Sequence, residues 1–124
     1  MKTVLIVEDN EKNMKLARDV LQAKGYATLE AVNGETGVQL ALAHHPDLVL
    51  MDIQLPDING LEAFRRIRAD PGAAHIPVSA FTASVTAGDR SRITDAGFDA
   101  FIGKPINLKE FLAIVQRLTE GGRG

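Results

Sequence analysis

The sequence predicts an α/β fold, a three-layer αβα sandwich in which helices cover both faces of a five-stranded parallel sheet. Apolar runs of strand length alternate about five times with segments in which apolar residues recur every three or four positions, as in an amphipathic helix. The runs at residues 4–7 and 48–51 are apolar at every position. Such runs are typical of strands that helices cover on both faces of a parallel sheet.

Strands and helices are expected in regular alternation along the chain. The apolar runs predict strands at residues 4–7, 27–31, 48–51, 78–81 and 100–102. The helical spacing predicts helices at residues 13–24, around 38–42, around 61–67, at 86–96 and at 108–118. In the last helix, the apolar stripe expected to face the core consists of Leu108, Phe111, Leu112, Val115 and Leu118.

Residues that favour helix ends agree with these boundaries. N-caps are expected at Asn33, Asn59, Thr86 and Asn107. Glycines in the left-handed conformation are expected to end helices at Gly25 and Gly97. The helix at 86–96 has few apolar residues to bury, so we expect it to be the least firmly packed. One domain is expected over residues 1–120, followed by a flexible tail at 121–124.

Composition excludes several classes of function. The 14 basic and 16 acidic residues leave a net charge of −2, whereas nucleic-acid binding usually needs a basic surface, so no nucleic-acid partner is expected. The chain has no cysteine, which excludes disulfides, thiolate metal sites and cysteine nucleophiles. No apolar run approaches membrane-spanning length and no signal peptide is evident. We therefore expect a cytoplasmic protein without a membrane partner.

Four of the five predicted strands end in residues with compatible chemistry. The first ends at Glu8 and Asp9, the third at Asp52, the fourth at Thr82, and the fifth at Lys104. Because ligands of parallel α/β sheets bind beyond the carboxyl ends of the strands, these side chains are expected at one edge. Each alone has an ordinary structural reading, as a loop residue, a cap or a surface cation. Their coincidence favours a shared site.

The expected cluster suits a divalent cation. Three neighbouring carboxylates repel one another unless a positive charge compensates them. Hard oxygen ligands favour Mg²⁺, or Mn²⁺ in its place, with a phosphate as a further ligand. Lys104 brings a fixed positive charge to the same edge, and the bond to Pro105 is a candidate cis peptide, since X–Pro bonds allow this form.

Four stretches of the sequence resemble the receiver domain of two-component response regulators. They are residues 4–10 (VLIVEDN), 50–60 (LMDIQLPDING), 81–83 (FTA) and 101–105 (FIGKP), and the resemblance extends from Thr3 to about Thr119. Among receivers the chain looks most like the single-domain DivK type. The resemblance implies a flavodoxin-like (CheY-like) sheet with strand order 2-1-3-4-5. It also implies a phosphorelay protein that is a phosphoacceptor signalling protein and not an enzyme, and that promotes its own phosphotransfer and dephosphorylation.

The resemblance assigns a role to each residue of the expected cluster. Asp52 would accept the phosphoryl group from a phosphohistidine of a histidine kinase or histidine phosphotransferase. Asp9 would be the main Mg²⁺ ligand, Glu8 would assist through water, and Asp52 and the backbone carbonyl of Gln54 would complete the protein ligands. Lys104 would neutralise charge on the phosphoryl group.

The resemblance further implies a conformational switch. Thr82 would bond a phosphoryl oxygen, and Phe101 would fill the space that Thr82 leaves. The helix at 86–96 would then shift. A downstream protein would bind the altered face, which this helix forms with the strand at 100–103 and the helix at 108–118. Gln54 and Ser84 stand where the family tunes hydrolysis of the phosphoryl group. The likeness to DivK points to cell-cycle or cell-fate control.

Other readings stay open at this point. An aspartyl-phosphate hydrolase would need a second carboxylate two residues after Asp52, where Gln54 stands. A flavodoxin-like cofactor binder would have to place a phosphate against Glu8 and Asp9, which would repel it. A receiver excised from a hybrid histidine kinase, and a degenerate receiver that binds partners without phosphorylation, are the remaining alternatives.

Overall fold

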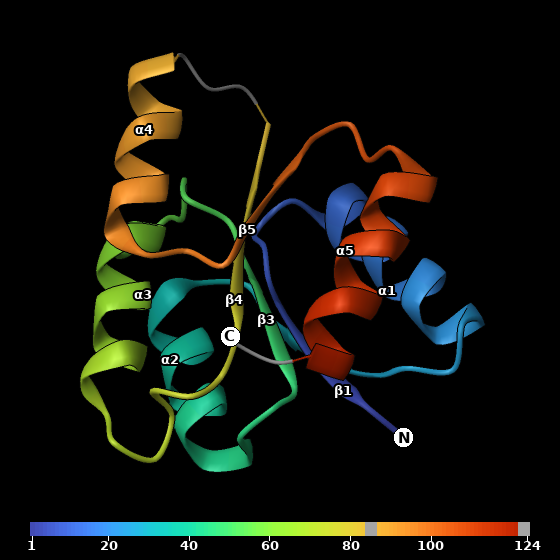
Figure 1. Ribbon diagram of the computed structural model, residues 1–124, viewed down its shortest axis with the longest axis horizontal. Coiled ribbons are helices and arrows are strands. Elements are labelled where there is room, and N and C mark those ends of the chain that lie inside the picture. The colour runs from blue at the N-terminus through green and yellow to red at the C-terminus, as the bar shows by residue number, and fades with distance from the viewer. Residues whose placement is uncertain (84–86, 122–124) are drawn as a thin grey trace.

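In the computed structural model, which describes residues 1–83 and 87–121, a twisted parallel sheet lies between two layers of helices (Figure 1). Its strands are β1 (Thr3–Val7), β2 (Ala27–Ala31), β3 (Leu48–Met51), β4 (Val78–Thr82) and β5 (Ala100–Gly103). All four pairings between neighbours are parallel, in the order β2-β1-β3-β4-β5. The predicted fold class and the implied strand order are both confirmed.

Helices connect the successive strands and cover the two faces of the sheet. They are α1 (Glu11–Ala23), α2 (Gly34–His44), α3 (Gly60–Ala69), α4 (Ala87–Ala96) and α5 (Leu108–Gly121). In Figure 1, α1 and α5 lie on one side of the sheet, and α2, α3 and α4 lie on the other. Among the helices of residues 1–83 and 87–121, none combines the length and apolarity that a bilayer span requires.

The apolar strands bury both of their faces, as the sequence predicts. In β1, Leu5 and Val7 belong to the core beneath α2 and α3. Val4 and Ile6 belong to the second core, beneath α1 and α5. Alternate side chains of a strand point to opposite faces, so a run without polar residues is required where both faces are covered.

Most predicted helix ends are confirmed by their hydrogen bonds. The side chains of Asn33, Asn59 and Asn107 each accept a backbone N–H three residues later, at 2.8–3.0 Å. Gly25 and Gly97 adopt φ angles of +89° and +103°, in the left-handed region that glycine adopts most readily. The cap predicted at Thr86 lies outside the described residues.

Three details of the helices differ from the prediction. Helix α1 begins at Glu11 because the side chain of Asn10 caps it by accepting the N–H of Asn13 at 3.0 Å. Leu108 is 54% exposed, so its prediction as part of the buried stripe is wrong. It is the first residue of α5, and the buried stripe begins one turn later at Phe111. Helix α5 extends to Gly121, the first residue of the predicted tail.

Helix α4 contributes little to the core. Its buried side chain is Ile93, and most of its other described residues are exposed. By comparison, α3 buries Ala63, Phe64 and Ile67. The small buried apolar area agrees with the expectation that this helix packs less firmly than the others.

Candidate functional site

The carboxyl ends of four neighbouring strands bring the predicted residues to one edge of the sheet. Glu8 and Asp9 follow β1, Asp52 follows β3, Thr82 ends β4, and Lys104 follows β5. The strand register explains this convergence. Val7 pairs with Met51 across β1 and β3, and Thr82 pairs with Gly103 across β4 and β5. The strands of each pair therefore end at the same level of the sheet, and the residues that follow them lie close together.

Three carboxylates form the acidic part of the site. Glu8, Asp9 and Asp52 each offer an oxygen atom, and these atoms lie within 4.8 Å of one another. Glu8 and Asp52 are buried, at 1% and 4% exposed, whereas Asp9 is exposed to solvent. This set of hard oxygen donors, open to solvent on the side of Asp9, fits the needs of Mg²⁺, which binds a few carboxylates and retains water ligands.

Lys104 lies against the two buried carboxylates. Its Nζ atom is 3.2 Å from Oδ2 of Asp52 and also donates a hydrogen bond to Oε1 of Glu8. The Lys104–Pro105 peptide bond is cis, and the backbone N–H of Lys104 donates to the carbonyl of Thr82 at 3.0 Å. The centre of the Phe81 ring lies 4.8 Å from the ammonium nitrogen. These contacts hold a cation where negative charge is concentrated.

The site carries a negative charge that a divalent cation would neutralise. Three carboxylates face one ammonium group, so two negative charges remain when all the carboxylates are ionised. Such an excess in a largely buried site is unfavourable without a cation or a bound proton. The charge balance therefore agrees with the donor set in favouring Mg²⁺.

The remaining predicted residues lie around this cluster. The backbone N–H of Gln54 donates to Oδ1 of Asp52 at 3.0 Å and so orients the carboxylate. Thr82 is buried at the end of β4. Phe101 lies away from the carboxylates, half-buried on the side of the sheet that α4 covers. Ser84 lies outside the described residues.

The pKa of Glu8 reflects its surroundings. Desolvation by burial is the largest cause that raises the pKa of this carboxyl group from 4.5 to about 7, and a hydrogen bond with Asp52 adds to the rise. The hydrogen bonds from Lys104 and from the backbone N–H of Asn10 act in the opposite direction. Without a metal ion, Glu8 thus holds a proton at pH values where a glutamate in water is ionised.

This shift predicts an unusual pH dependence of stability. The pKa of Glu8 in the folded state lies above its unfolded value. The stability that the folded protein has with Glu8 protonated is therefore fully present below about pH 4.5 and is lost as the pH rises through about 7. In the presence of a chelator, we expect the wild-type protein to lose stability between about pH 4.5 and pH 7 relative to Glu8→Gln. Urea unfolding of both proteins across this range measures the difference, and parallel profiles would contradict the assignment.

Comparisons with known proteins agree with this geometry. The sequence model of the response regulator receiver domain matches residues 4–116. The chain belongs to the response regulator receiver family. Receivers are signalling domains, and the implied family is thus confirmed.

Individual relatives and solved structures are also similar to this receiver. It is 48% identical over 115 residues to the polar-differentiation response regulator DivK of Brucella ovis, covering 93% of this chain and 94% of that protein. The receiver domain of a sensor histidine kinase from Pseudomonas aeruginosa, with magnesium in its active-site cleft, is 33% identical with a TM-score of 0.89, covering 96% and 98% of the two chains. A receiver domain of a histidine kinase from Syntrophus aciditrophicus is 30% identical, also with a TM-score of 0.89, covering 98% and 92%.

Asp57 in the loop between β3 and α3, and Gly60 at the start of α3, support the site without having been assigned a role from the sequence. Asp57 accepts the backbone N–H groups of Gly34 and Glu35, at 2.7 and 2.9 Å, and so caps α2 from a different loop. Gly60, the first residue of α3, donates its N–H to the carbonyl of Ile53 at 2.9 Å. Together they fix the path of the receiver chain just after Asp52.

We expect removal of the Asp57 carboxylate to loosen α2. Burial acts to raise its pKa, but hydrogen bonds from the N–H groups of Glu35 and Gly34 outweigh this and lower the pKa. Its contribution to stability is therefore present above about pH 4 and is lost as the pH falls below that value. Hydrogen exchange at Gly34 and Glu35 should be several-fold faster in Asp57→Ala at neutral pH.

Asp95 provides a matched control for this prediction. It is an exposed aspartate on α4, so Asp95→Ala should leave exchange at the start of α2 unchanged. Equal protection of the two amides in the wild-type receiver and Asp57→Ala would contradict the capping role.

Proposed function

We propose that the receiver accepts a phosphoryl group on Asp52 from a phosphohistidine of a histidine kinase or histidine phosphotransferase. The observation that carries this proposal is the convergence of Asp52 with two further carboxylates and Lys104 at one edge of the sheet. Burial and the Gln54 N–H hold Asp52 in place. A buried carboxylate beside both a candidate cation site and an ammonium group suits attack on a phosphorylated donor.

The reaction exchanges one bond to phosphorus for another. A carboxylate oxygen of Asp52 attacks the phosphorus atom, the P–O bond forms, and the P–N bond to the donor imidazole breaks. The departing nitrogen keeps the bonding electron pair. Lys104 is placed to stabilise negative charge on the phosphoryl oxygens, and such electrostatic stabilisation supplies most of the catalysis in phosphoryl transfer. The same surroundings would promote hydrolysis of the acyl phosphate by water.

The acidic cluster is proposed to hold Mg²⁺, or Mn²⁺ in its place. Asp9 and Asp52 would bind the ion directly, with the backbone carbonyl of Gln54, and Glu8 would assist through water. When bound, the ion would neutralise charge on the transferring group. The magnesium in the Pseudomonas aeruginosa receiver, at 33% identity, supports this assignment.

Phosphorylation is proposed to change a protein-binding face. The phosphoryl group adds about −1.5 to −2 charge and three acceptor oxygens. Thr82 would move towards it and Phe101 would follow, altering the face formed by α4, β5 and α5 for a downstream protein. The identity to DivK, whose name assigns it to polar differentiation, supports a role in cell-cycle or cell-fate control. We place this role in the cytoplasm, where the ATP that supplies histidine kinases is found.

A receiver of a hybrid histidine kinase is the second candidate. The two solved receivers from histidine kinases, at 33% and 30% identity, favour it. The acceptor chemistry would be the same in both cases. The two candidates differ in whether the donor histidine lies on a separate protein or on the same polypeptide.

Phosphotransfer profiling tests the acceptor assignment. The purified receiver is incubated with labelled histidine kinases and phosphotransferases, with Mg²⁺ or with a chelator, and the labelled residue is mapped by mass spectrometry after borohydride reduction of the acyl phosphate. We expect Mg²⁺-dependent labelling of Asp52, and the fastest donor identifies the pathway. Phosphoramidate serves as a small P–N donor. Labelling at another residue, or no labelling by phosphoramidate with Mg²⁺, would overturn the proposal.

A further inference from the structure

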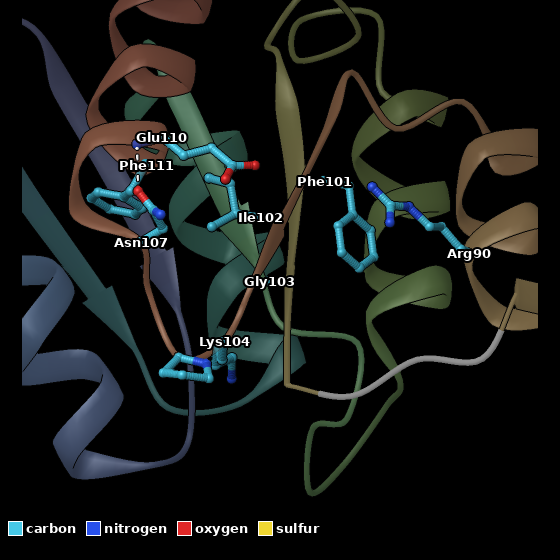
Figure 2. A pocket seen from close by; sticks show the side chains of 9 residues that line it. Arg90, Phe101, Ile102, Gly103, Lys104, Asn107, Glu110 and Phe111 are labelled. Carbon is cyan, nitrogen blue, oxygen red and sulfur yellow. Dashed lines mark hydrogen bonds between the residues drawn. The ribbon is translucent and has the colours of Figure 1, made fainter.

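A contact between α4 and β5 involves the residue proposed to switch. The guanidinium carbon of Arg90 lies 4.5 Å from the centre of the Phe101 ring. Figure 2 shows these two side chains together on the α4 side of β5, whereas Asn107, Glu110 and Phe111 lie on the α5 side. Arg90 is exposed and Phe101 is half-buried. This geometry is a cation–π contact at the surface.

The strand register relates this contact to the site. Phe101 pairs with Ala80, and Gly103 pairs with Thr82, so Phe101 lies on the face of the sheet that also carries Thr82, two residues before the end of β5. Rotation of the ring towards Thr82 would carry it away from Arg90. The ring therefore cannot keep its contact with α4 and occupy the space beside the end of β4 at the same time.

We propose that Arg90 is a positioning residue that holds Phe101 beside α4 and opposes its inward rotation. This inference rests on the proposed function and adds a regulatory contact to it. Among the side chains of α4 that the structure describes, Ile93 is the buried one, and the contact of Arg90 with Phe101 adds a further link between this helix and β5. Phosphorylation at Asp52 would then weaken the contact and release α4. By reciprocity, loosening the contact favours the phosphorylated state.

The expected change in affinity follows from the strength of a cation–π contact. A cation–π contact at an exposed site changes an equilibrium constant by about two- to five-fold. Removing the guanidinium should shift the equilibrium towards the inward ring by this factor. The receiver should therefore bind an analogue of the phosphoryl group more tightly, even though Arg90 carries a positive charge that would by itself attract an anion.

Titration with beryllium trifluoride and Mg²⁺ tests the inference on the full chain. The apparent Kd is measured for the wild-type protein, Arg90→Gln, Phe101→Leu and the double variant. We expect Arg90→Gln to tighten binding about two- to five-fold in the wild-type background and to have no effect when Phe101 is already leucine. Only a coupling between the two side chains gives this non-additivity.

Lys109→Gln controls for charge, since it removes one exposed cation near the start of α5. We expect it to leave the apparent Kd unchanged or to weaken binding slightly. Equal effects of Arg90→Gln in both Phe101 backgrounds, weaker binding by Arg90→Gln, or no effect would overturn the inference while leaving the proposed function intact. A wild-type protein that does not bind the analogue would overturn the proposed function, and the inference with it.

Discussion

Asp52→Asn is expected to abolish phosphorylation while making the metal-free receiver more stable. The asparagine side chain keeps the shape of Asp52 and an oxygen that accepts the N–H of Gln54, but it has no carboxylate to attack phosphorus. The substitution also removes one of the two buried carboxylates that contact Lys104. Burial is the main cause of the raised pKa of Glu8, and a hydrogen bond with Asp52 and repulsion from its charge add to the rise. Removing that charge should therefore add about 1 kcal/mol to the free energy of unfolding where Glu8 is ionised.

The two effects are measured separately. Labelling with phosphoramidate and Mg²⁺ gives the loss of activity, and urea unfolding at pH 8 with a chelator gives the change in stability, at a pH where Glu8 is largely ionised. Asp95→Asn, at an exposed position on α4, should label normally and change stability by less than about 0.5 kcal/mol. Residual labelling of Asp52→Asn would contradict the acceptor assignment, and a loss of stability would contradict the proposed repulsion.

The elements of the fold could be predicted because burial dictates their patterns. A strand covered on both faces must be apolar throughout, and β3 satisfies this condition at all of its positions. Capping side chains depend on neighbours in the sequence, so Asn33 and Asn59 were also predictable. The start of α1 was missed because its apolar spacing begins only at Met14, and the cap at Asn10 lies outside that pattern.

The core of the site could be predicted from one topological rule. Because parallel strands carry their carboxyl ends to one edge, residues far apart in the sequence meet there, as Glu8 and Lys104 do. The supporting contacts follow no such rule. Asp57 caps a helix that begins 23 residues earlier, and Arg90 on α4 contacts Phe101 on β5. Pairs of this kind depend on how loops and helices pack, which periodicity and spacing do not specify.

Gly60→Ala is expected to destabilise the receiver and to disturb Asp52. A Cβ atom at this position would lie 2.2 Å from the carbonyl oxygen of Asp52 and 2.7 Å from Cα of Ile53. Both are backbone atoms, so neither can rotate away, and either the start of α3 or the chain after β3 must move. Overpacking of this kind should lower the free energy of unfolding by about 2–4 kcal/mol.

The same displacement should slow phosphorylation more than the loss of stability alone explains. Misplacing a reacting group by about 1 Å can cost about 10²-fold in rate, and the clash involves the backbone of Asp52 itself. Phosphoramidate labelling is therefore measured under conditions where both proteins are fully folded. Gly121→Ala is the matched control, because a Cβ atom there would have no neighbour within 4 Å. If Gly60→Ala labels at the wild-type rate, the close packing of α3 does not position the acceptor.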